Sequence, residues 1–425
     1  MNSPTRSKDP NGERKGDSSA HLLGSRPMTS VSVPERLVGH LLAGHPWLYA
    51  ESVPEIQDAT TGDFVALLTP KRRLLGVALF DANSAIALRV LSIRADERPG
   101  IELWRRRICD ALALRKEALD LRSTDAYRLL HGEGDRLPGI VVDNYAGYLS
   151  LKLDTTAWLP HLQDLSQALM DVVQPRGIYL KGVSGSRRKG APKSSPLAAP
   201  RVLAGEPPPE PTRVREHGMQ LGVSLVHGQK TGFFLDQREN RALIRRYSSE
   251  RRVLNLFSYT GGFSLAAALG GATVVTSVDT AAAAIAGARD NFRLNKLNPD
   301  DHEFEVDDAF AYLERCATQK RNFDLVICDP PSFAPRKQAV TKALRAYTRL
   351  HRQALRRVAR GGLLAAASCS SHISMEMFLG TLRDAAAKCR RPLRLLECRH
   401  EPADHPSYLH FPEGRYLKFA LMLAD

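Results

Sequence analysis

The chain has 425 residues, of which 43% are hydrophobic and 25% are charged, and its formal net charge is +14. This length predicts two or three globular domains, and no apolar run approaches the roughly 18 residues of a membrane span, which argues against a membrane protein. Six cysteines without paired spacing argue against a disulfide framework or a metal site and predict a cytoplasmic protein, whereas the positive charge favours a nucleic acid as partner.

The first hundred residues divide into two parts. Residues 1–30 are rich in Ser, Pro, Gly and Lys and have no periodic apolar positions, so we expect a disordered extension. Residues 31–100 contain short runs typical of strands, separated by Gly and Pro, and predict a small β-barrel-like domain. The clearest strands are Phe64–Leu68, Leu75–Leu79 and Ala87–Leu91.

Residues 101–184 predict a central α/β domain. An amphipathic helix is expected at Ile101–Leu121, where apolar residues recur among Arg and Lys. The segment that follows, 185–213, holds seven prolines and predicts a linker, either a mobile connection or a long hairpin. The other elements expected in the central domain are strands Gly139–Val142, Tyr148–Leu153 and Gly177–Lys181 and a helix at Leu159–Val173.

Residues 214–425 alternate between runs typical of strands and helices of about ten or more residues. Such alternation predicts an α/β domain with a parallel sheet and crossover helices. Ligands of such sheets bind at the carboxyl ends of the strands, so residues just after each strand are candidates for a site. The expected strands are Arg252–Leu256, Thr273–Val278, Glu303–Val306, Leu325–Cys328 and Leu363–Ala367.

The first of these strands leads into a glycine-containing turn. Gly261 and Gly262 allow the backbone to approach a ligand at the start of an Ala-rich helix. The next strand ends at Asp279, where a carboxylate can accept hydrogen bonds from ribose hydroxyls. The pair of features predicts a nucleoside-type cofactor, while the lack of a GxGxxG pattern disfavours a dehydrogenase.

Acidic residues also follow the third and fourth strands. Asp307 and Asp308 end the third, and Asp308 is the better candidate for an adenine contact, although an N-cap of the next helix explains it equally well. The fourth strand ends in Asp329-Pro-Pro-Ser-Phe333, in which two prolines predict a stiff loop at the ligand edge. Phe333 either packs on a planar base or is a buried core residue.

The fifth strand is followed by Ser368-Cys-Ser-Ser-His372. A lone cysteine is more often a small core residue than a nucleophile. Here Cys369 follows a strand among polar residues, a position that suits an accessible thiolate. The role of Cys398 stays open, and four cysteines within predicted strands or helices are interpreted as structural: Cys109, Cys316, Cys328 and Cys389.

With these motifs assembled, the chain resembles the ribosomal RNA large subunit methyltransferase I family, bacterial enzymes that form 5-methylcytosine in 23S rRNA. The resemblance covers nearly everything from Val31 onward. Seven segments carry it in order: His45–Trp47, Gly132–Gly139, His227–Arg238, Asn255–Gly262, Asp329–Phe333, Ser368–Ser370 and Pro412–Lys418.

The resemblance implies a PUA-like RNA-binding domain at 31–100, a central α/β domain, and a class I Rossmann-like methyltransferase domain that uses S-adenosylmethionine (SAM). It places the ribose and adenine contacts on Asp279 and Asp308 and the catalytic cysteine on Cys369. The partner it implies is RNA, specifically 23S rRNA, and the enzyme could act as a homodimer. The candidate SAM contacts are Lys230, Phe233, Gln237, Asn255, Phe257, Tyr259, Gly261, Asp279, Asp308 and Asp329.

The chemistry implied is addition of a thiolate to C6 of cytosine, which makes C5 nucleophilic towards the SAM methyl group. Cys369 is the candidate nucleophile and Asp329 the candidate contact to the N3/N4 edge. Glu413 is a candidate base for the C5 proton, although Pro412-Glu-Gly414 can equally be a structural turn. The target base must leave its stack to reach such a site.

Two other functions compete with this one. A guanine-N methyltransferase of the same fold would need no cysteine, and Ser-Cys-Ser argues against it. A non-catalytic RNA-binding assembly protein would not need Asp279, Asp329 and Cys369 together. The chain departs from the family in its N-terminal extension, its basic segment Lys181–Lys189 and its Pro-rich connection, and these departures bear on the RNA target more than on the chemistry.

Overall fold

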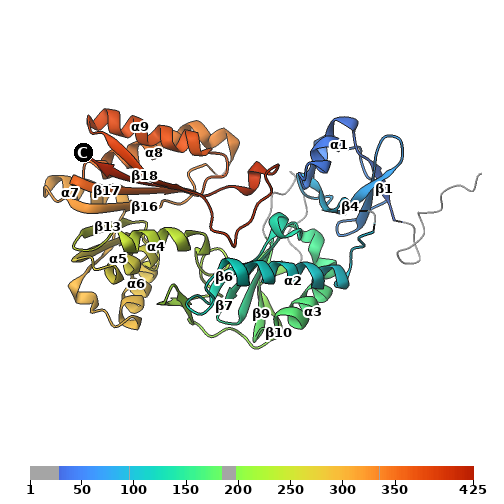
Figure 1. Ribbon diagram of the computed structural model, residues 1–425, viewed down its shortest axis with the longest axis horizontal. Coiled ribbons are helices and arrows are strands. Elements are labelled where there is room, and N and C mark those ends of the chain that lie inside the picture. The colour runs from blue at the N-terminus through green and yellow to red at the C-terminus, as the bar shows by residue number, and fades with distance from the viewer. Residues whose placement is uncertain (1–27, 95, 184–197, 335) are drawn as a thin grey trace, which may run out of the picture.

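The computed structural model describes residues 28–94, 96–183, 198–334 and 336–425. Figure 1 shows three regions: an N-terminal domain, a central domain and a larger C-terminal domain, with the central domain lying against both of the others. The extension expected to be disordered lies outside the described residues as far as residue 27, and Ser30 already begins a strand.

The N-terminal domain is built on a five-stranded sheet with the order β1-β3-β4-β5-β2. In β3 every second residue is buried, as in a strand with one face on a core. The three strands expected here are present to within one residue at each end, but helix α1 was not expected, and only Leu41 of it is buried. The elements are β1 (Ser30–Ser32), α1 (Glu35–Leu42), β2 (Trp47–Tyr49), β3 (Phe64–Leu68), β4 (Leu74–Phe80) and β5 (Ile86–Ser92).

The central domain has a second five-stranded sheet, with the order β10-β9-β8-β7-β6. Trp104 and Trp158 are fully buried in its core, with ring centroids 5.1 Å apart. The expected strands and helices are present, and β6 and β10 are additional. The elements are α2 (Ile101–Ala118), β6 (Ala126–His131), β7 (Ile140–Tyr145), β8 (Tyr148–Leu153), α3 (Leu162–Val173), β9 (Gly177–Val183) and β10 (Arg201–Gly205).

The segment expected as a linker, 185–213, contains regular structure in its second half. Strand β10 pairs antiparallel with β9, as the long-hairpin alternative requires, and residues 184–197 lie outside the described residues. The pairing supplies partners to backbone groups at the edge of β9 that would otherwise depend on water. Strand β11 (Thr212–Glu216) then begins inside the same segment and pairs with β12 (Met219–Val223).

The C-terminal domain has a seven-stranded sheet with the order β15-β14-β13-β16-β17-β19-β18. The first five of these strands are parallel, as expected from the alternating pattern, whereas β19 is antiparallel to both β17 and β18. The antiparallel pair was not expected. The strands are β13 (Arg252–Leu256), β14 (Val274–Asp279), β15 (Glu303–Val306), β16 (Phe323–Cys328), β17 (Val358–Ser368), β18 (Leu393–Arg399) and β19 (Lys418–Ala424).

Helices cover both faces of this sheet, which confirms the expected α/β architecture (Figure 1). In α8 the buried residues Ala343, Tyr347, Leu350 and Ala354 recur every three or four positions and form one apolar face. No helix among the described residues is long and apolar enough to cross a membrane. The helices are α4 (Arg238–Arg246), α5 (Gly262–Leu269), α6 (Ala282–Leu294), α7 (Ala309–Thr318), α8 (Val340–Leu355) and α9 (Met375–Cys389).

Candidate active site

The turn between β13 and α5 carries strain and unpaired polar atoms. Phe257 and Tyr259 adopt positive φ angles of 59° and 48°, a conformation that is costly for aromatic residues and is concentrated at functional sites. Three buried side-chain oxygens of this turn find no hydrogen-bond partner within the described part of the chain: Asn255 Oδ1, Ser258 Oγ and Thr260 Oγ1. Buried polar atoms are normally paired, so the turn is suited to a polar ligand.

Asp279 holds this turn against the end of β14. Its Oδ2 accepts a hydrogen bond from the Tyr259 N–H at 2.8 Å, and its Oδ1 accepts one from the Ala281 N–H at 3.0 Å. A carboxylate offers about four acceptor positions, so Asp279 can still accept from a ligand hydroxyl. The structure therefore brings Asp279 and the turn together, as expected for a nucleoside site.

The two glycines of the turn are explained by packing within the protein. A Cβ on Gly261 would lie 2.8 Å from the Cβ of Ala288 in α6, and a Cβ on Gly262 would lie 2.9 Å from Cζ of Phe233. Phe233 is itself buried, with the Arg241 guanidinium over its ring at 4.7 Å. These contacts give a structural reason for the glycines beside the close ligand approach expected from the sequence.

Asp308 lies at the start of α7 and accepts hydrogen bonds from the N–H groups of Phe310 and Ala311 at 2.9 and 3.1 Å. It is therefore an N-cap, the alternative that the sequence left open. Its neighbour Asp307 pairs with Arg315 at 2.7 Å. The cap leaves the Asp308 carboxylate exposed beside the ends of β14 and β15.

Cys369 follows β17 and is held between two anchored serines. The Tyr347 hydroxyl lies 2.9 Å from Ser368 Oγ and 3.1 Å from Ser370 Oγ. Ser370 Oγ also lies 3.0 Å from Ser332 Oγ in the loop after Asp329. Ser370 Oγ thus links the end of β17, which carries Cys369, with the loop after β16, which carries Asp329.

Phe333 is half-buried, and its ring lies 4.8 Å from that of Tyr347 and packs against the main core cluster, as the core alternative requires. Cys316 and Cys328 are buried, as expected of structural thiols. Cys109 and Cys398 are exposed, and Cys398 contacts Met375 Sδ at 3.4 Å.

The carboxyl of Asp329 lies among other charged groups. Burial, and then the neighbouring Asp236 carboxylate, raise its pKa to about 7, while Lys230, Arg241 and a hydrogen bond from Gln237 act in the opposite direction. Close like charges cannot both ionise freely. Asp329 can therefore hold or release a proton near neutral pH, which suits a general acid and base.

Asp236 and Tyr416 belong to the same group, although neither was singled out from the sequence. Asp236 Oδ2 accepts hydrogen bonds from Lys230 Nζ at 2.5 Å and from the Tyr416 hydroxyl at 2.8 Å. Burial alone would raise the pKa of Asp236, but Lys230 keeps it below its usual range. Both residues lie in segments that carried the family resemblance, and that was the only signal available for them.

Burial raises the pKa of the Cys369 thiol, and the Asp329 carboxylate raises it further, whereas Lys230 and Lys418 lower it. Lys418 donates to the carbonyl oxygens of Ser370 and Tyr416, both at 2.6 Å, and burial lowers its pKa to about 8. At neutral pH the resting thiol is protonated, so a reaction through its thiolate requires a proton acceptor close by.

Glu413, the candidate base, makes its ion-pair contact outside this group. Its carboxylate lies 3.6 Å from His45 Nε2 in the N-terminal domain. No described hydrogen bond or ion pair connects it with Cys369, Asp329 or Lys230. The short helical turn at Pro412–Gly414 supports the structural alternative for this motif.

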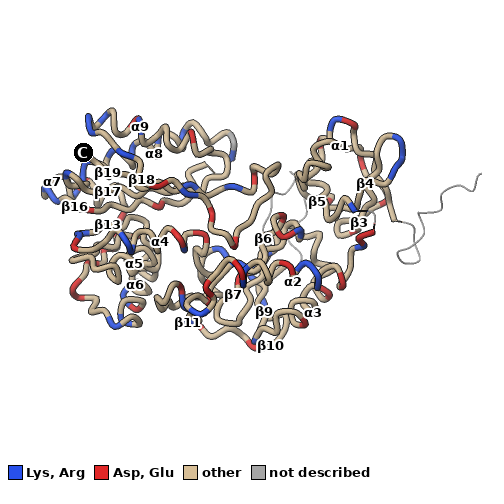
Figure 2. Tube along the Cα trace, in the orientation of Figure 1, with Lys and Arg blue, Asp and Glu red and all other residues tan. Residues whose placement is uncertain are grey.

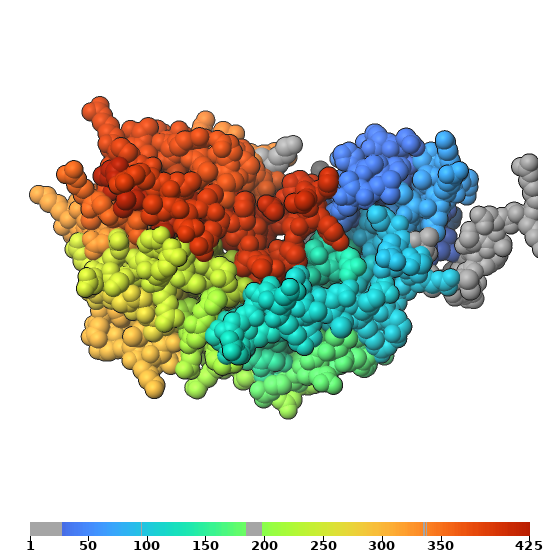
Figure 3. All heavy atoms as spheres, viewed as in Figure 1, coloured from blue at the N-terminus to red at the C-terminus, as the bar shows by residue number. Residues whose placement is uncertain are grey.

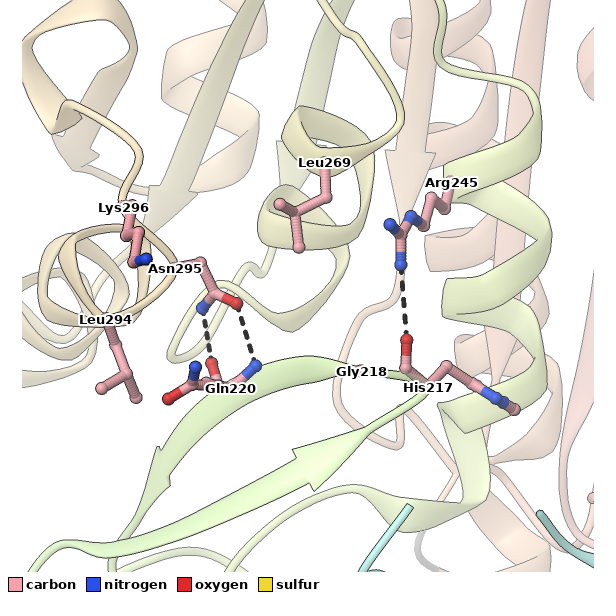
Figure 4. Close-up of a pocket in the computed structure, with 8 residues that line it drawn as sticks. All are labelled: His217, Gly218, Gln220, Arg245, Leu269, Leu294, Asn295 and Lys296. Carbon is pink, nitrogen blue, oxygen red and sulfur yellow. Dashed lines mark hydrogen bonds between the residues drawn. The ribbon is translucent and has the colours of Figure 1, made fainter. Parts of the chain in front are cut away.

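The described residues line a cavity beside these groups and another away from them. One, of about 310 Å³, lies where the three domains meet and is lined by Lys230 and Glu413 among others. The second, of about 290 Å³, lies between β12 and the C-terminal ends of α4, α5 and α6, and no predicted site residue lines it (Figure 4). Figure 2 shows Lys and Arg interspersed with Asp and Glu along all three domains.

Comparisons with known proteins agree with this architecture. Residues 128–410 match the family of S-adenosylmethionine-dependent methyltransferases, and residues 31–93 match the PUA-like domain. A solved methyltransferase complexed with SAH is 26% identical, with a TM-score of 0.82 over 93% of this chain and 100% of that one. A SAM-dependent methyltransferase structure from Streptococcus mutans, 24% identical with a TM-score of 0.80, shares the fold over 93% of this chain and 100% of that one.

Two curated relatives are similar over nearly their whole length. A ribosomal RNA large subunit methyltransferase from Deinococcus radiodurans is 38% identical over 94% of this chain and 98% of that protein. A ribosomal RNA large subunit methyltransferase I from Serratia proteamaculans is 37% identical over 89% of this chain and 95% of that protein. With its N-terminal PUA-like domain and SAM as cofactor, the chain belongs to the ribosomal RNA large subunit methyltransferase I family.

Proposed function

We propose that this chain transfers the methyl group of SAM to C5 of a cytosine in 23S rRNA of the large ribosomal subunit. The names of its relatives support the RNA class. The observation that carries the cytosine assignment is Cys369, held at the end of β17 close enough to Asp329 for their charges to interact. A thiol beside a carboxyl that titrates near pH 7 is the pairing that C5 methylation of a pyrimidine requires.

The first step forms a bond between Cys369 Sγ and C6 of the cytosine. The thiol proton passes to the ionised Asp329 carboxyl, which in turn protonates N3 as sulfur attacks C6. The electron pair of the C5–C6 double bond forms a C4–C5 double bond, and the electron pair of the C4–N3 double bond takes up the proton at N3, so that C5 becomes nucleophilic. The pKa of Asp329, about 7, allows it both to accept and to give this proton at neutral pH.

SAM supplies an electrophilic methyl group to C5. Removal of the C5 proton then re-forms the C5–C6 double bond as the C6–S bond breaks. The proton on N3 returns to Asp329. Glu413, predicted as the base for the C5 proton, lies at the domain junction beside His45. Glu413→Gln tests that role: a missing base should leave the methylated RNA attached to Cys369, whereas normal turnover without an adduct would remove Glu413 from the mechanism.

The cofactor is assigned to the turn after β13. Asp279 would accept hydrogen bonds from the ribose hydroxyls. Asp308 would accept one from the adenine amino group, through carboxylate lone pairs that the helix cap does not use. Gln237 and Asp329 lie together at the methyl-transfer end. The remaining proposed contacts are Lys230, Phe233, Asn255, Phe257, Tyr259 and Gly261, of which Phe233 is buried and acts through packing.

Guanine-N methylation on the same fold is the competing chemistry. It would leave Cys369 without a function, and the buried tyrosine that anchors both of its neighbours would be unexplained. A non-catalytic RNA-binding protein would have no use for a buried carboxyl whose pKa is raised to about 7, because such a group costs stability.

Methylation of 23S rRNA transcribed in vitro, followed by mass spectrometry of its nucleosides, tests the proposal. We expect 5-methylcytidine in the reaction with the wild-type protein and SAM, and none with Cys369→Ala. A methylated guanosine, or 5-methylcytidine formed equally by Cys369→Ala, would contradict it.

A further inference from the structure

The cavity at the domain junction is lined by residues from all three domains. Trp47 comes from the N-terminal domain, Glu133 and Lys152 from the central domain, and Phe411 and Tyr416 from the C-terminal domain. In Figure 3 a red-orange segment of the C-terminal domain extends to the place where the N-terminal and central domains meet. The cavity therefore exists only because the domains pack together, and its volume of about 310 Å³ is at the lower end of the range for small-ligand pockets.

The domain packing that forms this cavity is fixed by aromatic contacts. The rings of Trp47 and Phe411 meet edge to face at 4.6 Å, and His45 meets Phe411 at 5.7 Å. Trp47 Nε1 donates to Glu133 Oε1 at 2.7 Å. These contacts bind the N-terminal domain to the other two and hold the cavity walls in place before any ligand arrives.

The lining suits a nucleobase better than a phosphate. The aromatic rings supply flat apolar surface for stacking. Its charged groups are of both signs and largely paired, with Lys152 3.3 Å from Asp154 and Lys230 2.5 Å from Asp236. A phosphate site would present unpaired cations, whereas carboxylates such as that of Glu133 accept hydrogen bonds from the amino groups of bases.

The cavity is connected with the catalytic group through two side chains. Lys230 and Tyr416 line the cavity and both donate to Asp236. Asp236 and Lys230 in turn act electrostatically on Asp329 and Cys369. A base in the cavity would thus lie on one side of the Lys230–Asp236 pair, and the reacting base would lie on the other side. Two neighbouring nucleotides of an unstacked strand could take up these two positions.

We propose that this junction cavity receives a nucleobase that neighbours the methylated one in a single-stranded stretch of the RNA substrate, stacked on its aromatic lining and read by the Glu133 carboxylate. The proposal rests on the proposed function in that RNA is the substrate, but it does not depend on which base is methylated. The cavity becomes a subsite that selects the sequence context of the target and positions the strand across Lys230.

Ultraviolet crosslinking of the full-length protein to 23S rRNA transcribed in vitro, with SAH present, tests where the strand lies. Peptide mapping should find crosslinks at Trp47 or Tyr416, and the attached nucleotide should be adjacent to the site of methylation. Crosslinks confined to other surfaces, with methylation intact, would overturn the proposal. Crosslinks at the cavity next to a methylated guanine would overturn the cytosine assignment and leave the subsite standing.

Variants give a second measurement. Glu133→Gln keeps an acceptor for Trp47 but loses the charge, and we expect its KM for RNA to rise roughly tenfold to a hundredfold, the factor typical of a base contact, with SAM affinity unchanged. Lys152→Met should raise the KM for RNA by a smaller factor. The matched control Lys296→Met, at the cavity in Figure 4, should not change it. Unchanged KM in both junction variants would contradict the subsite.

Discussion

Two buried groups of charged residues lie close together in this protein and differ in how their charges are paired. Between the central and C-terminal domains, Asp404 accepts two hydrogen bonds from Arg238, at 2.8 and 2.9 Å, and one from the Arg128 N–H at 2.9 Å. Arg115 donates to the Asp404 carbonyl oxygen and pairs with Asp135. Every charge named here has an opposite charge within hydrogen-bond distance.

The proposed catalytic group has fewer of its charges paired. Asp236, Asp329 and Cys369 are three acidic groups near the ammonium groups of Lys230 and Lys418, and the pKa values of Asp329 and Cys369 are raised. Paired charges of the first kind hold domains in register, whereas shifted pKa values of the second kind leave protons available near neutral pH. The difference predicts that substitutions in the first group affect folding and those in the second affect the rate.

The largest effect should follow from Asp404→Asn. The substitution removes the buried carboxylate that pairs with Arg238 and leaves this guanidinium with the partly exposed Glu239 as its anionic partner, at 3.0 Å. Breaking a buried pair typically costs about 3–5 kcal/mol. Urea unfolding should show this loss. In the matched control Asp110→Asn, whose partner Arg136 is exposed, the loss should stay within about 1 kcal/mol. Similar losses in both variants would mean that the junction group does not hold the domains.

Asp329→Asn should reduce kcat by about a hundredfold, the lower range for losing a general acid, with little change in stability. The wild-type kcat/KM should rise with pH up to about 7, where Asp329 ionises and can accept the thiol proton, and then level off until the thiol itself ionises. In the variant the bend near pH 7 should be absent, because no carboxyl titrates there. A wild-type profile without that bend would contradict the relay.

Asp279→Ala should weaken SAM binding by about 1–3 kcal/mol, the scale of a lost hydrogen bond to a charged group, as measured by calorimetry. Asp324→Ala is the control, since Asp324 also accepts a backbone N–H, from Arg252 at 2.9 Å, but lies at the opposite end of the parallel strands. Equal SAM affinity in the wild type and in Asp279→Ala would remove Asp279 from the cofactor site.

Substitutions of Asp308 should give the smallest effect, and two of them distinguish its proposed roles as helix cap and as adenine contact. Asp308→Ala removes the cap of α7 and should cost about 1 kcal/mol of stability. Asp308→Asn keeps the cap, so its stability should match the wild type. If the adenine contact is real, both variants should bind SAM more weakly, whereas SAM affinity unchanged in Asp308→Asn would leave Asp308 with the cap alone.

The residues of the proposed site that follow strands could be located from the sequence. Asp279, Asp329 and Cys369 each come directly after or at the end of a buried apolar run, and a parallel sheet brings such ends to one edge. Local patterns also located most strands to within a few residues, because apolar runs bounded by Gly, Pro or polar residues mark them.

The parts that the sequence did not predict depend on contacts between distant residues. Asp236 and Tyr416 are 180 positions apart and meet only in the folded chain. Strand β10 lies in a segment whose prolines left a mobile connection and a long hairpin as alternatives, and it is a strand because β9 offers it an open edge. The sequence offered the Asp308 cap only as one of two alternatives, and the packing role of Gly261 was visible only once α6 was in place.

The most direct test of the account is whether Cys369 becomes bonded to the substrate base. RNA that contains 5-fluorocytosine should trap the wild-type enzyme, because fluorine at C5 cannot leave as a proton and the C6–S bond then cannot break. We predict a SAM-dependent RNA–protein adduct that survives denaturing electrophoresis. It should be absent from Cys369→Ala, which should still bind SAM, and present in Cys328→Ala. A Cys369→Ala enzyme that forms the adduct, or that methylates cytosine at a near-normal rate, would contradict the central claim.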